Sequence, residues 1–410
     1  MANISTLESL LTLVKEQQDD IANLRQEVAT CFTEVVLLRE CLFAEGSLRP
    51  SMLQQWACKH QTAMRHRASF NEMLQVEDVA SMLAAFVGPM SLRAAANTSH
   101  AMRGFAGQAW SRVEGLRQWT VYICGGSQFL DGQLPQRFIP AMGIWEPLPQ
   151  MQENRVHGIA AIAGGMCYVC GGMNSQGVLN SVESFNPVAL SWSSAPSMCV
   201  ARQKLCGGNI NGRIFACGGF NDDDMSALNT VECFHPADAA WEIVRPMGQH
   251  RASAVAGVLR GCLFVCGGVR NDLEGAMELR SVECLDPNAQ AWHVMPPMFA
   301  QRASAAAAVL DGRMYVCGGV SGKEILGSVE RFDPEDGCWA VEPWMQTGRF
   351  SAMAVSIGGH ILVLGGQSGA RYSSVSESSI EKLDPQQRSW MMLSPMVERR
   401  SRAMAAAAFE

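Results

Sequence analysis

The chain has 410 residues, of which 48% are hydrophobic and 17% are charged, and its formal net charge is −7. This content is ample for a globular core, and the length alone predicts two or three domains. A mildly acidic chain without a basic stripe argues against nucleic-acid binding, and no run of 18 apolar residues predicts a membrane span. Residues 1–6 lack the basic and apolar segments of a secretory signal, so none is expected.

Residues 7–42 repeat apolar side chains at alternating spacings of three and four residues. The repeating positions are Leu7, Leu10, Val14, Gln17, Ile21, Leu24, Val28, Cys31, Val35, Leu38 and Leu42. This periodicity predicts a coiled coil over residues 1–50 that pairs two copies of the chain, with Gln17 compatible with fixing the register. The alternative is a long amphipathic helix that lies on another domain.

Residues 51–73 carry local positive charge and are predicted to form a connector. Residues 74–115 then predict three short helices, with a break at Gly88-Pro89 and a possible cap at Ser91. Their pattern resembles an F-box, which implies docking to a Skp1-like adaptor, although Gln75 replaces the usual proline. The implied adaptor-binding residues are Leu74, Val79, Leu83, Phe86, Val87 and Leu92. Alternatively, these residues form the core of an unrelated helical spacer.

From residue 116 onward, one unit of 46 to 51 residues recurs six times. Each unit combines a glycine pair, a tryptophan, a methionine six residues later and an arginine four residues after that. The pairs begin at Gly125, Gly171, Gly218, Gly267, Gly318 and Gly365, and the arginines are Arg155, Arg202, Arg251, Arg302, Arg349 and Arg400. A repeat of this period indicates one supersecondary unit copied around an array.

Each unit holds four predicted strands. In one copy they fall at 251–258, at 261–266, at 281–287 and from Trp292 onward. Four antiparallel strands in each of six units predict an all-β six-bladed propeller over residues 116–410, preceded by the helical region. The units resemble kelch repeats, in which an aromatic residue precedes the double glycine by three positions, as Tyr168 does here.

The end of the chain is predicted to close the ring. The last tryptophan, Trp390, is followed by only 20 residues, too few to reach another glycine pair. The first unit begins near Trp119 without an innermost strand, so residues 400–410 are expected to supply it. Such closure would leave no sheet with an open inner edge.

The six arginines are candidate ligands for a partner. Strand alternation predicts that they share one face with the loops of variable length, where binding specificity is usually placed. A guanidinium holds a carboxylate through two parallel hydrogen bonds, so an acidic peptide is the expected target. Lys204 and Arg402, two residues beyond Arg202 and Arg400, add charge to one side. The alternative is that the arginines brace neighbouring loops by bonding carbonyls.

Five of the 15 cysteines precede glycine pairs, at positions too far apart between blades for disulfides, and are predicted to be buried small hydrophobes. A reducing cytoplasmic or nuclear setting fits best. No nucleophile elbow, phosphate-binding glycine loop or histidine pair at ligand spacing occurs, so neither an enzyme, nor a metal, nor a cofactor is expected.

Two functions remain. The first is the substrate-recognition subunit of an SCF-type ubiquitin ligase, with the F-box-like unit docking the adaptor and the propeller holding the target. The second is a dimeric scaffold or cytoskeletal binding protein without ubiquitin machinery.

Overall fold

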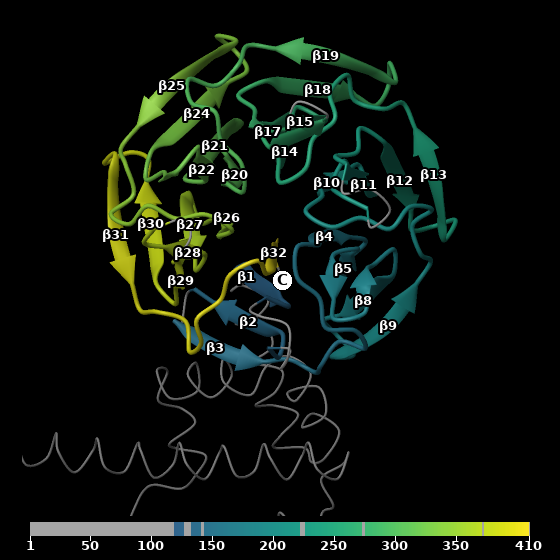
Figure 1. Ribbon diagram of the computed structural model, residues 1–410. Coiled ribbons are helices and arrows are strands. Elements are labelled where there is room, and N and C mark those ends of the chain that lie inside the picture. Colours follow the sequence, from purple (N-terminus) through teal and green to yellow (C-terminus); the bar gives the residue numbers. More distant parts are fainter. Residues whose placement is uncertain are drawn as a thin grey trace, which may run out of the picture. The chain divides into compact units, whose positions relative to one another are not determined.

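The computed structural model describes residues 119–126, 133–140, 143–221, 226–272, 275–370 and 373–409. They form a six-bladed propeller within the unit Gln118–Glu410 (Figure 1). The predicted coiled coil (1–50), connector (51–73) and F-box-like unit (74–115) lie outside the described residues. So do the adaptor-binding candidates Leu74, Val79, Leu83, Phe86, Val87 and Leu92. Within the described part of the chain, no helix has the length and hydropathy to cross a membrane.

Each blade is a four-stranded antiparallel sheet ordered from the axis outward. Blade 2 holds β4 (Ile159–Ala163), β5 (Met166–Cys170), β8 (Val182–Asn186) and β9 (Ser191–Ala195), and blade 3 holds β10 (Cys206–Ile210), β11 (Arg213–Cys217), β12 (Val231–His235) and β13 (Ala240–Val244). Blade 4 holds β14 (Val255–Leu259), β15 (Cys262–Cys266), β18 (Val282–Asp286) and β19 (Ala291–Met295). Blade 5 holds β20 (Ala306–Leu310), β21 (Arg313–Cys317), β24 (Val329–Asp333) and β25 (Cys338–Glu342), and blade 6 holds β26 (Met353–Ile357), β27 (His360–Leu364), β30 (Ile380–Asp384) and β31 (Ser389–Leu393).

Blade 1 is built from both ends of the propeller sequence, as predicted. The C-terminal strand β32 (Met404–Phe409) pairs antiparallel with β1 (Trp119–Cys124) in a register that sets Trp119 opposite Phe409. The strands β2 (Gln136–Ile139) and β3 (Ile144–Pro147) complete the sheet on its outer side. The C-terminal segment therefore lies beside the axis and closes the ring (Figure 1).

The repeated tryptophans join each blade to the one before it. In blades 2 to 6 the indole Nε1 donates to a backbone carbonyl of the preceding link, as Trp192 does to Pro149 at 2.8 Å. In blades 1, 2, 3 and 5 the ring also packs on the phenylalanine opposite it, as Trp192 does on Phe185, whereas in blades 4 and 6 the residue opposite is leucine. Buried aliphatic, methionine and cysteine side chains fill the space between blades. The five cysteines before glycine pairs are buried and free, which confirms their assignment to the core.

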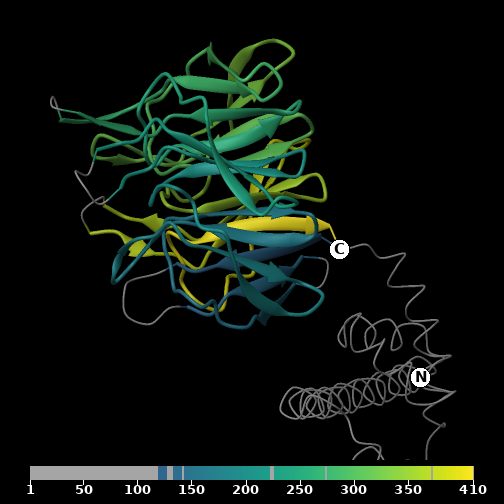
Figure 2. The ribbon, with the colours of Figure 1, turned by 90° about the vertical axis from the view of Figure 1, so that its right-hand side faces the viewer.

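In four blades, a short hairpin between the second and third strands lies on one face of the propeller. The hairpins are β6 (Met173–Asn174) with β7 (Gly177–Val178), β16 (Val269–Asp272) with β17 (Gly275–Glu278), β22 (Val320–Ser321) with β23 (Glu324–Ile325), and β28 (Gln367–Ser368) with β29 (Val375–Ser376). The residue after each of five repeated arginines, from Arg155 to Arg349, bridges to this loop in its own blade. Arginines and variable loops thus share a face, as predicted, and β32 ends on the opposite side (Figure 2).

Candidate functional site

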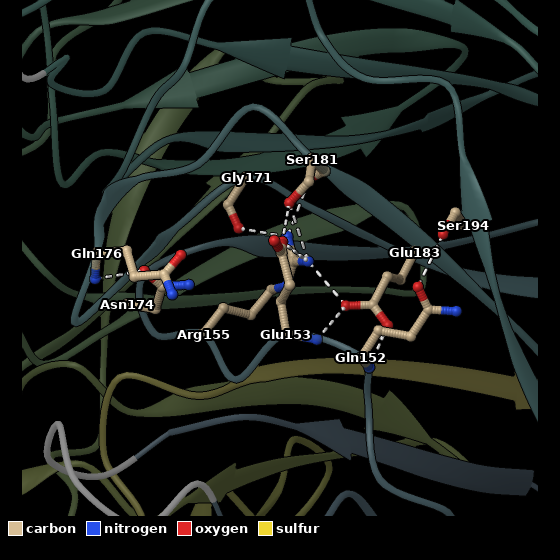
Figure 3. A network of polar contacts seen from close by, with 9 residues as sticks. All are labelled: Gln152, Glu153, Arg155, Gly171, Asn174, Gln176, Ser181, Glu183 and Ser194. Atoms are coloured by element: carbon tan, nitrogen blue, oxygen red, sulfur yellow. Dashed lines mark hydrogen bonds and ion pairs between the residues drawn. The ribbon is translucent and has the colours of Figure 1, made fainter.

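The repeated arginines are buried, and each ties its blade together from the inside. Arg155 precedes β4, and its Nη1 donates to the carbonyls of Gly171 at 3.1 Å and Ser181 at 2.9 Å (Figure 3). Its Nη2 lies 2.8 Å from Oε1 of Glu183 on β8. Glu183 also accepts the backbone N–H groups of Gln152 and Glu153 in the link from blade 1. One carboxylate therefore holds both the arginine and the incoming link.

The same arrangement recurs in blades 3 to 6. The pairs are Arg202 with Glu232 at 2.7 Å, Arg251 with Glu283 at 2.7 Å, Arg302 with Glu330 at 2.5 Å and Arg349 with Glu381 at 2.6 Å. The arginine carbonyl also accepts an N–H from the second glycine of the preceding blade, as Arg202 does from Gly172. A Cβ on Gly171 would lie 2.7 Å from that same carbonyl oxygen, and a Cβ on Gly172 would lie 2.5 Å from the carbonyl oxygen of Val156, which explains the double glycine.

Burial changes the role predicted for these side chains. Arg155, Arg202, Arg251, Arg302, Arg349 and Arg400 are each at most 2% exposed. In blades 2 to 6 a glutamate already occupies the position that a ligand carboxylate would need. The structure therefore shows the bracing role for the six arginines and no open arginine ring.

Arg400 differs because no buried carboxylate pairs with it among the described residues of blade 1. The equivalent of Glu183 is Gln136, whose Oε1 has no hydrogen-bond partner in the part of the chain that the structure describes. Arg400 donates instead to the carbonyls of Gly125 and Leu134, and Glu398 lies 3.4 Å away. Burial lowers the pKa of Arg400, and Glu398 offsets part of that effect.

Two residues beyond each arginine, the backbone forms a closed ring around the axis. Six successive backbone N–H groups donate to the carbonyl of the equivalent residue in the preceding blade, at 2.8 to 3.0 Å. The ring residues are His157, Lys204, Ser253, Ser304, Ser351 and Arg402, with His157 donating to Arg402. All six have a positive φ, between 50° and 61°. The ring satisfies their backbone groups and leaves only their side chains for other contacts.

A pocket of about 270 Å³ opens at this ring on the arginine face. His157, Lys204 and Arg402 line it from blades 2, 3 and 1, and Ser304 and Ser351 line it from blades 5 and 6. Phe350, Gln367, Ser374 and Val320 complete the wall. The pocket therefore has a basic side, formed by Lys204 and Arg402 with the imidazole of His157 between them, and a hydroxyl side opposite. We call it the channel mouth.

The basic side of the channel mouth holds excess positive charge. Burial, with the charges of Lys204 and Arg402, lowers the pKa of His157 to about 3. Burial and the charge of Arg402 also lower the pKa of Lys204. The Lys204 ammonium lies 5.6 Å from the centre of the Phe220 ring, in a cation–π contact. No ion pair of Lys204 or Arg402 with a carboxylate occurs among the described residues, so this side suits an acidic ligand.

Sequence reasoning missed a second group of side chains, on the outer part of blade 3. Cys233 and His235 on β12 and Glu242 on β13 bring one ligand-type atom each within 4.8 Å of one another. The sequence does contain a signal for this group, the Cys-x-His spacing of Cys233 and His235, because residues two apart on a strand share a face. The group holds a single histidine, so a pattern of paired histidines does not reveal it.

Comparisons agree with this architecture. Residues 208–409 match the model described as the KLHDC2/KLHL20/DRC7 Kelch-repeats domain, and residues 160–198 match the Kelch motif. The chain therefore carries kelch repeats in a six-bladed propeller. A solved structure titled "Structure of YjhT" matches with a TM-score of 0.57 and 15% identity, covering 63% of this chain and 88% of that one. At that identity the likeness concerns the fold alone.

Curated relatives match over shorter stretches. Kelch-like protein 26 of Homo sapiens is 32% identical over 106 residues, which is 24% of this chain and 17% of the relative. Kelch-like protein 26 of Danio rerio is 24% identical over 205 residues, or 48% of this chain and 34% of the relative. Kelch-like ECH-associated protein 1B of Danio rerio is 30% identical over 103 residues, or 24% and 18%. The chain thus matches between 17% and 34% of the length of these relatives.

Proposed function

We propose that the propeller is a protein-interaction module that captures an acidic segment of a partner at the channel mouth. The observation that carries this proposal is the asymmetry of the backbone ring. Lys204 of blade 3 and Arg402 of blade 1 supply cations on either side of His157 without a carboxylate partner among the described residues, whereas the opposite side holds serines. A carboxylate bound there would relieve the repulsion between the two cations and gain charge-assisted hydrogen bonds.

The role of the arginines in this proposal is indirect. Arg155, Arg202, Arg251, Arg302, Arg349 and Arg400 fix the links that carry the ring, so they position the channel mouth without touching the ligand. Loops from the second-to-third-strand hairpins, which reach the same pocket through Gln367 and Ser374, would add specificity.

We further propose that the module serves as the substrate-recognition subunit of an SCF-type ubiquitin ligase. The support is the F-box-like pattern of residues 74–115, with Leu74, Val79, Leu83, Phe86, Val87 and Leu92 as the surface for a Skp1-like adaptor. A coiled coil over residues 1–50 would pair two copies and raise avidity for a repeated target. Without adaptor binding, the same channel mouth would serve a scaffold protein.

The channel-mouth proposal is tested with a fluorescent deca-glutamate peptide as probe. Lys204→Ser and Arg402→Ser place at these positions the residue that three other blades carry, with the same backbone conformation. We expect each variant to weaken binding about 10- to 100-fold, since a charged hydrogen bond contributes about 1.5–3 kcal/mol. Lys323→Ser removes an equal charge from a hairpin on the same face and is the matched control. Equal affinities of Lys204→Ser and Lys323→Ser would contradict the proposal.

The ligase proposal is tested separately by co-purification with a Skp1-like adaptor. Leu83→Asp together with Phe86→Asp should abolish adaptor capture while leaving peptide binding at the channel mouth unchanged. Failure of the wild-type chain to bind the adaptor would leave the scaffold function standing.

A further inference from the structure

The outer strands of blade 3 bring together three side chains of the kinds that bind zinc. Cys233 and Glu242 face each other across the β12–β13 pair, and His235 lies two residues along β12 on the same face. Nε2 of His235 is 3.7 Å from Sγ of Cys233 and 2.8 Å from Oε1 of Glu242. All three ligand-type atoms lie within 4.8 Å of one another.

These separations suit a single small cation. With a Zn–S bond of about 2.3 Å and a Zn–N bond of about 2.0 Å, the sulfur and nitrogen of a tetrahedral site lie roughly 3.5 Å apart. The observed 3.7 Å between Sγ and Nε2 is close to that value. The carboxylate oxygen needs to move away from Nε2 by about 0.5 Å, since a metal would replace the present hydrogen bond. The Glu242 side chain is 56% exposed, which leaves it free to do so.

A further carboxylate lies on the other nitrogen of the same imidazole. Oδ2 of Asp238 is 3.9 Å from Nδ1 of His235, while Nε2 is the nitrogen directed to Cys233 and Glu242. Histidines that bind metals usually present their second nitrogen to a carboxylate, which fixes the tautomer and orientation of the ring. Asp238 is in place to take this part after a small movement of its exposed side chain.

The geometry points to a zinc site formed by Sγ of Cys233, Nε2 of His235 and a carboxylate oxygen of Glu242, with solvent as the fourth ligand and Asp238 as a positioning residue. Mixed sulfur, nitrogen and oxygen donors in this number favour Zn²⁺ over Ca²⁺ or Mg²⁺, which prefer oxygen. The mouth of the site is open to solvent at His235 and Glu242, whose side chains are 25% and 56% exposed.

The protonation state of the Cys233 thiol decides whether zinc binding releases a proton. Burial and the charge of Glu242 raise the pKa of Cys233 to about 12, partly offset by Arg213, so the metal-free protein holds a thiol. Binding of Zn²⁺ forms the Zn–S bond and releases the thiol proton to solvent. The Arg213 charge favours the thiolate but repels the cation.

Blade 2 supplies a matched variant of the site. At the three equivalent positions it carries Ser184, Asn186 and Ser193 in the same strand pairing. The triple substitution Cys233→Ser, His235→Asn and Glu242→Ser therefore uses residues that this fold already accepts there. Cys199→Ser removes an exposed cysteine elsewhere and is the control.

The experiment titrates the metal-free full chain with Zn²⁺ against a chromophoric chelator, and with Co²⁺ as a spectroscopic probe. We expect the triple variant to lose one tightly bound equivalent of Zn²⁺ and the thiolate-to-cobalt charge-transfer band of that equivalent, while Cys199→Ser keeps both. Asp238→Ala should weaken this equivalent about 10- to 100-fold. Equal zinc stoichiometry in the wild type and the triple variant, or no zinc bound by the wild type, would overturn the proposal. Peptide binding at the channel mouth is a separate readout, so the two proposals fail independently.

Discussion

At the scale of single residues, the buried arginine–glutamate pairs decide where the links between blades lie. Each pair is shielded from water, and the glutamate also accepts two backbone N–H groups of the incoming link. Taking two charges out of water is costly, so such a pair contributes little net stability compared with an apolar replacement of both partners. Removing only one partner is different, because it leaves a buried charge without compensation.

Glu283→Gln tests this at Arg251. The substitution keeps the shape but removes the negative charge, and we expect a loss of about 3 kcal/mol in the free energy of unfolding, measured by denaturant titration. Glu335→Gln is the control, since its pair with Arg260 is exposed, with side chains 72% and 56% accessible. It should change stability by less than about 1 kcal/mol. Equal effects of the two substitutions would show that the buried pair is dispensable.

His157 predicts a pH dependence of stability. Its pKa is about 3 in the folded chain against 6.5 for the unperturbed group. Above pH 6.5 the imidazole is neutral in both states and contributes no pH dependence. Below pH 6.5 the imidazole is protonated in the unfolded chain and stays neutral in the folded chain. The free energy of unfolding therefore falls by roughly 1.4 kcal/mol per pH unit until the folded pKa is reached.

His157→Ser should remove that loss of stability, because serine has no group that binds a proton in this pH range. The substitution should be tolerated, since the equivalent residue is serine with the same backbone conformation in three other blades. Between pH 7 and pH 4 the wild type is expected to lose up to about 3 kcal/mol more stability than the variant. Denaturant titrations at both pH values measure the difference. Parallel losses in the two proteins would mean that His157 accepts its proton normally in the folded chain.

At the scale of elements, blade 1 departs from the other five. Among the described residues, its arginine has no buried carboxylate partner, and the side-chain acceptor of Gln136 and the indole N–H of Trp145 have no hydrogen-bond partner. In blades 2 to 6 the equivalent groups are bonded. The blade assembled from the two ends of the propeller is therefore the one with the poorest internal bonding.

Gln136→Glu should increase the stability of this blade by supplying the missing carboxylate. A carboxylate there would face Arg400 and, by analogy with Glu183, the backbone N–H groups of Val397 and Glu398. We expect a gain of about 1.5–3 kcal/mol, the range for hydrogen bonds to charged groups. Thermal and denaturant unfolding of the full chain measure it. A lower stability would indicate that desolvation of the new carboxylate outweighs its contacts.

Much of the strand structure can be predicted from the sequence, because six repeats show the same pattern and each copy supports the prediction for the others. The strands, the shared face of arginines and loops, and the pairing of the C-terminal tail with Trp119 were all predictable. Burial of the arginines was not predictable, because Glu183 lies 28 residues from Arg155 in the sequence and no local pattern indicates that the two pair. The backbone ring at His157 also escaped prediction, since it depends on equivalent residues of neighbouring blades meeting at the axis. The coiled coil and F-box-like unit stay predictions.

At the scale of the whole molecule, two sets of backbone hydrogen bonds close the propeller. One is the ring of six backbone hydrogen bonds, in which the step from His157 to Arg402 joins the first and last links. The other is the blade 1 sheet, in which β32 pairs with β1 along its whole length. Both depend on the last ten residues. Because β32 also contacts the innermost strands of blades 2 and 6, its removal would expose apolar surface on both neighbours.

Deletion of residues 401–410 should therefore destabilise the entire propeller and not blade 1 alone. The deletion removes Arg402 from the ring and all of β32, and it leaves Val121, Ile123 and Tyr122 on an open strand edge. We expect a lower melting temperature, a broader transition and aggregation through the open edge of β1. Adding a synthetic peptide of residues 400–410 in trans should restore part of the loss, whereas a peptide with Ala405 and Ala407 replaced by proline should not, since proline cannot donate to a strand ladder. Unchanged melting of the truncated chain would show that the inner strand of blade 1 does not close the ring energetically.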